Sequence, residues 1–130
     1  MTPNHQVLFA WSWIFLGLVT GMGMGLMFHR DNWLGGYGTW KRRLARLGHI
    51  AFFGTGLLNL AMALTRTAFE VQGPSADAAS AMLAVGAVAM SSVCFLSAWR
   101  KGLRHLFALP VGLLVGGTGV FVFALIDLLL

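Results

Sequence analysis

Three of the four histidines lie close to the ends of long apolar runs. His29 follows the first run, His49 lies near the start of the second, and His105 directly precedes the fourth. Imidazole can ligate haem iron or form a hydrogen bond to a quinone headgroup, and it titrates near neutral pH. We therefore expect His49, His105 and His29 to be candidate contacts to a cofactor such as haem b or a quinone.

His49 is the strongest of these candidates. It lies three residues beyond Arg46 and deeper in its apolar run, whereas His29 and His105 each adjoin an arginine. At about 100° per residue, Asn59 falls on the same helix face as His49, and a polar group in the middle of a span is a candidate functional residue. In the alternative interpretation, the histidines are interfacial anchors and Asn59 forms a hydrogen bond between helices.

The elements that carry these residues are four apolar runs, over residues 7–28, 47–65, 78–98 and 106–126. A helix of about 20 residues crosses the roughly 30 Å hydrocarbon layer of a membrane. With 58% hydrophobic and only 10% charged residues, the chain has too few polar groups to cover a water-soluble globule. We predict an all-α integral membrane protein, in which residues 1–130 form a single four-transmembrane-helix bundle. Thr39 is a plausible N-cap, so the second helix is expected to begin before its apolar run.

The basic residues predict the orientation of these spans. Eight of the nine lie in the first and third connections, over residues 29–46 and 99–105. By the positive-inside rule, these two connections are cytoplasmic and both termini lie outside, in the bacterial cytoplasmic (inner) membrane. The net charge of +5 thus reflects topology, and we expect no nucleic-acid partner. Seven of these residues are also candidate contacts to lipid headgroups: Lys41, Arg42, Arg43, Arg46, Arg100, Lys101 and Arg104.

Glycines recur at helical spacing in the first and fourth runs, and Gly56 lies on the small-residue face of the second. Small residues allow close approach of helix backbones in a membrane, where there is little hydrophobic drive to associate. We therefore expect these glycines to lie in helix contacts, within the bundle or against a partner: Gly17, Gly21, Gly25, Gly56, Gly112, Gly116 and Gly119. On the opposite side of the membrane from the basic connections, Arg66 and Asp127 lie at the outer edge and are a candidate ion pair.

No catalytic or metal-binding set is expected. The carboxylates Glu70, Asp77 and Asp127 are predicted to lie across the membrane from three of the histidines, and the single cysteine, Cys94, excludes an internal disulfide. No acidic or basic residue lies deep in a span, which argues against a proton-coupled exporter. The leading hypothesis is a non-enzymatic accessory membrane subunit of a bacterial energy-converting or electron-transfer complex, with membrane lipids and other subunits as partners. The alternatives are an autonomous homo-oligomeric transporter or channel, and a lipid-organising or assembly protein without a ligand.

Overall fold

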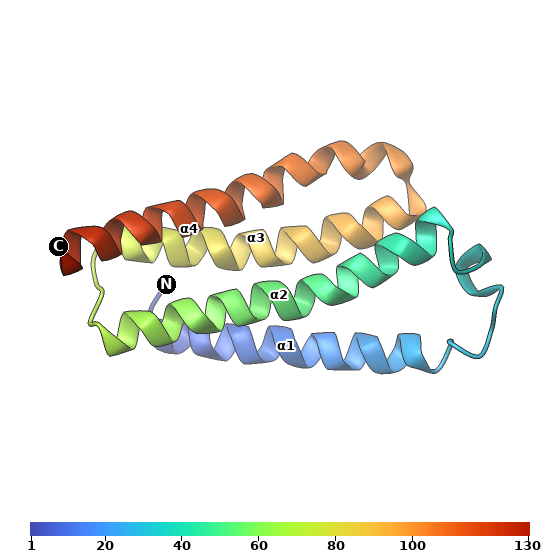
Figure 1. Cartoon of the computed structure of the whole chain (residues 1–130), viewed down its shortest axis with the longest axis horizontal. Coiled ribbons are helices and arrows are strands. Elements are labelled where there is room, and N and C mark those ends of the chain that lie inside the picture. Colours follow the sequence, from blue (N-terminus) through green and yellow to red (C-terminus); the bar gives the residue numbers. More distant parts are fainter.

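The computed structural model describes residues 1–130 as four long helices (Figure 1). They are α1 (Pro3–Gly25), α2 (Trp40–Ala68), α3 (Pro74–Trp99) and α4 (Ala108–Leu129), with 3₁₀ segments η1 (Trp33–Gly35) and η2 (Lys101–Phe107) in the connections. All four are long and apolar enough to cross a membrane. The predicted all-α bundle with four candidate membrane spans is therefore confirmed.

Helix α2 begins seven residues before its apolar run. The hydroxyl of Thr39 accepts a hydrogen bond from the backbone N–H of Arg42 at 3.4 Å, which satisfies one of the free donors at the helix start. The indole N–H of Trp40 donates to the carbonyl of Ser97 at 2.7 Å and ties this first turn to the end of α3. The sequence-based prediction of an early start at Thr39 is confirmed.

The helices follow one another in an open row (Figure 1). Helix α1 packs on α2, α2 on α3, and α3 on α4, whereas α1 and α4 do not meet. Short connections favour antiparallel neighbours, which accounts for the order of the row. Buried residues are accordingly concentrated in α2 and α3, and α1 and α4 each bury only a narrow stripe.

Four of the seven predicted packing glycines lie in contacts between helices. A Cβ atom added at Gly17, Gly21, Gly56 or Gly116 would come within about 3 Å of a side chain on the neighbouring helix. The structure adds three more such glycines that were not singled out from the sequence: Gly48, Gly86 and Gly117.

Gly25, Gly112 and Gly119 make no such contact within the bundle, so for these three the prediction of packing against a partner stays a prediction. No atom lies within 4 Å of a Cβ at any of them, so these three face away from the bundle. Helical spacing places glycines on one face of a helix, but a row of helices leaves part of α1 and α4 without a neighbour.

Candidate functional site

His49 lines a small cavity between α1 and α2. The imidazole lies directly on Gly21, where a Cβ atom would be 2.6 Å from the ring carbon Cε1. The edge of the ring faces Phe53, with the ring centres 5.3 Å apart and the planes almost perpendicular. The glycine thus lets α2 present a half-buried imidazole against the backbone of α1.

One nitrogen of His49 is already used. Its Nδ1 lies 3.3 Å from the hydroxyl of Thr20, which also lies 2.9 Å from the carbonyls of both Leu16 and Gly17. Because a hydroxyl has one proton, and the shorter contacts direct it to these carbonyls, we assign Nδ1 of His49 as the donor to Thr20. In a neutral imidazole, Nε2 is then a hydrogen-bond acceptor without a protein partner.

The cavity beside this ring has a volume of about 220 Å³. Its walls are formed by Gly21, Met24, Phe28, Arg46, His49 and Ile50. This is smaller than the roughly 300–1,000 Å³ of most small-molecule pockets, so it suits a single polar headgroup or ring. His49 supplies an acceptor and Arg46 supplies donors, while the other walls are largely apolar.

The structure does not bring the predicted cofactor residues together. His29 and His105 are both exposed, and η2, which carries His105, packs on α3 and α4 without reaching α2. His49 and His105 are thus not placed to act as the two axial ligands of one haem. Asn59 lies ten residues from His49, about 15 Å along the helix axis, and belongs to a different cluster.

That cluster is a buried chain of polar side chains from three helices. The amide of Gln6 donates to Asn59 Oδ1 at 3.2 Å, and the amide of Asn59 donates to the carbonyls of Thr55 at 2.9 Å and Leu83 at 3.3 Å. The hydroxyl of Ser80 donates to Gln6 Oε1 at 2.8 Å. Asn59 therefore bonds between helices, as in the structural alternative considered for it.

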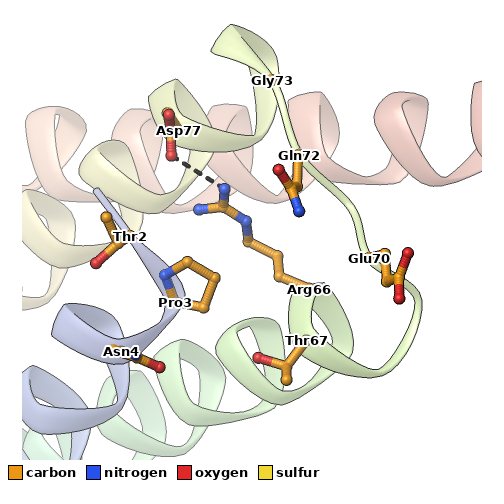
Figure 2. Close-up of a pocket in the computed structure, with 9 residues that line it drawn as sticks. All are labelled: Thr2, Pro3, Asn4, Arg66, Thr67, Glu70, Gln72, Gly73 and Asp77. Carbon is orange, nitrogen blue, oxygen red and sulfur yellow. Dashed lines mark hydrogen bonds and ion pairs between the residues drawn. The ribbon is translucent and has the colours of Figure 1, made fainter.

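Arg66 continues this chain toward the end of the bundle. Its guanidinium donates to the hydroxyl of Ser80 at 2.7 Å, to the carbonyls of Met1 at 2.8 Å and Val71 at 3.2 Å, and to Asp77 at 3.0 Å. The side chain of Arg66 is only 3% exposed, whereas that of Asp77 is 54% exposed. Figure 2 shows the guanidinium pointing from α2 toward Asp77 on α3.

The candidate ion pair between Arg66 and Asp127 does not form, and Arg66 pairs with Asp77 instead. Asp77 occupies the first turn of α3, which packs on α2, whereas Asp127 belongs to α4, which does not. Sequence reasoning also missed Gln6 and the polar contacts of Ser80. A signal for both was present in the sequence. Each is a polar residue near the start of a span, at a membrane depth similar to that of Arg66 near the end of the second span.

Arg42 is not available to a lipid headgroup. It is 4% exposed, and its guanidinium carbon lies 5.5 Å from the ring centres of Phe28 and Trp33 and 5.2 Å from that of Tyr37. Such placement of a cation over aromatic faces is favourable, and it folds the first connection against α2. The other predicted headgroup contacts remain accessible: Lys41, Arg43, Arg100, Lys101 and Arg104 are exposed, and Arg46 is half-buried.

The fold and these two sites define an all-α protein with four candidate membrane spans, a histidine-lined cavity and a buried polar cluster. No family model, curated protein or solved structure matches the chain. Its function is therefore inferred from its own residues.

Proposed function

We propose that this protein is a non-catalytic integral membrane subunit of a bacterial energy-converting or electron-transfer complex, and that the His49 cavity borders a quinone. The observation that carries the proposal is that His49, whose Nε2 atom has no protein partner, lines a largely apolar cavity of about 220 Å³. A quinol hydroxyl would donate to Nε2, and a quinone carbonyl would accept from Arg46. The cavity would hold the polar ring alone, with the isoprenoid tail in the surrounding lipid.

The outer faces of α1 and α4 support the role of a subunit. Large apolar side chains on α1 are more than half exposed, among them Leu8, Trp11, Phe15 and Met22. On α4, Gly112 and Gly119 leave open positions beside Val115 and Phe123, which are about as exposed as those on α1. Small residues on a membrane-exposed helix face favour close approach by another helix. In our proposal, these faces contact other membrane subunits.

Replacing His49 with alanine tests the ligand. We expect the wild-type protein, purified from its native membrane in a mild detergent, to retain quinone, and His49→Ala to retain about tenfold less, the effect of one lost hydrogen bond. Extraction followed by chromatography measures the quinone. His105→Ala is the matched control, because it removes an exposed histidine with no place in the cavity.

The same preparation tests the subunit role. Other membrane proteins should co-purify with the wild-type chain in fixed stoichiometry. If the protein instead behaves as a complex of identical copies and His49→Ala retains as much quinone as wild type, the proposal is wrong and the autonomous transporter or lipid-organising alternatives are favoured.

Reporter fusions test the orientation that the proposal requires. The two connections with most of the basic residues should face the cytoplasm, because positive charge is retained on that side. A phosphatase reporter active only outside should therefore be active when fused after Leu130 or within residues 69–73, and inactive when fused at Gly36. The opposite pattern would place the His49 cavity near the outer surface of the membrane and contradict the proposed orientation.

A further inference from the structure

A second, larger cavity opens at the end of the bundle away from the basic connections. It has a volume of about 440 Å³ and lies between the start of α1, the end of α2 and the start of α3 (Figure 2). Apart from Pro3 and Gly73, every residue that lines it has a polar or charged side chain. The volume is in the range of small-molecule sites. In a chain with so few polar residues, such a cavity suits a polar group at the level of the lipid headgroups.

The cavity offers one free negative charge and an unused guanidinium hydrogen. Asp77 is committed to Arg66 and to the amino group of Met1, and these are the two ion pairs of the chain. Glu70 lines the same cavity, is exposed and has no ion-pair or hydrogen-bond partner. The guanidinium of Arg66 has five N–H groups and uses four of them, so one donor remains.

We propose that this cavity binds a small zwitterion through its primary ammonium group and its anionic group, with the phosphoethanolamine headgroup of a phospholipid as the ligand it fits. The ammonium would donate to Glu70, and the phosphate would accept from the remaining N–H of Arg66 and from the amides of Asn4 and Gln72. A choline headgroup has no N–H to donate. A purely anionic headgroup is disfavoured because the three carboxylates at this end outnumber its two cations, Arg66 and the amino group of Met1. This site does not depend on the His49 cavity.

Lipid retention by the full-length protein tests the proposal. The protein is reconstituted into nanodiscs with equal amounts of phosphatidylethanolamine and phosphatidylcholine, then released in mild detergent, and the retained lipids are measured by native mass spectrometry. We expect phosphatidylethanolamine to be enriched about two- to fivefold, the size of one accessible ion pair. Glu70→Gln should abolish the enrichment.

Two further variants separate the site from general effects of charge and folding. Asp127→Asn removes an exposed carboxylate from the same end but outside this cavity, and it should keep the preference. Glu70→Asp keeps the negative charge and should also keep the preference for phosphatidylethanolamine. A lipid preference that survives Glu70→Gln would overturn the proposal, and so would equal retention of the two lipids by wild type together with no Glu70-dependent binding of a soluble headgroup.

A soluble headgroup identifies the source of the zwitterion. Glycerophosphoethanolamine is added to the protein in nanodiscs of phosphatidylcholine alone, and binding is measured by calorimetry. Glu70-dependent binding would support the site and identify a free solute as a ligand. Its absence, together with Glu70-dependent lipid enrichment, would support the site for the membrane lipid.

Discussion

Replacing Arg66 with methionine is expected to lower the free energy of unfolding by about 2–3 kcal/mol. The change removes a buried, charged donor and leaves the carbonyls of Met1 and Val71 without partners. A hydrogen bond to a charged group contributes about 1.5–3 kcal/mol, and a buried acceptor left unsatisfied costs about as much. The exposure of Asp77 limits the loss, because water can solvate its carboxylate. Titration of the reconstituted protein with dodecyl sulfate, followed by circular dichroism, measures the change.

Two variants calibrate that measurement. Arg43→Met makes the same replacement at an exposed position of α2, and it should change the free energy of unfolding by less than about 0.5 kcal/mol. Arg66→Lys should lie between, since three ammonium donors cannot match the planar set of the guanidinium. If Arg66→Met were as harmless as Arg43→Met, the polar cluster would not hold the three helices together.

Replacing Gly21 with leucine is expected to have the second large effect. A Cβ atom there would be 2.6 Å from Cε1 of His49, so the imidazole must leave its place against α1. Overpacking of this kind typically costs about 1–3 kcal/mol. The displaced ring would also disrupt the cavity, so Gly21→Leu should reduce both the free energy of unfolding and the quinone retained on purification.

Gly25→Leu is the matched control for this substitution. Gly25 lies one turn further along α1, and no atom lies within 4 Å of the position of its Cβ. It should leave the stability of the monomer and the His49 cavity unchanged. Equal loss of stability in the two variants would contradict the packing of Gly21 against His49.

The existence, number and approximate limits of the helices could be predicted from the sequence. Each apolar run is about as long as a membrane is thick, and this length is a property of the run itself. The early start of α2 was predictable for a similar reason, because Thr39 caps a backbone N–H only three residues away. Such local properties depend only on residues that are close together in the chain, so they can be read from the sequence.

The partners of individual side chains were decided by the tertiary structure. Asp77 and Asp127 are both acidic and both close to the end of a span, and only the order of the helices places Asp77 on Arg66. Likewise, Gly21 and Gly25 share one ridge of α1, but only Gly21 lies against a neighbouring helix.

The candidate sites divide in the same way. The type and depth of His49 mark it as a candidate from sequence. Its separation from His105 follows from the packing of η2, which contacts α3 and α4 but not α2. Arg42 was expected at the membrane surface, and the fold of the first connection buries it among three aromatic rings. The hydropathy of a residue indicates whether it favours lipid or water. It does not indicate which residue of another helix will contact it, because helix packing brings together residues that are far apart in the chain.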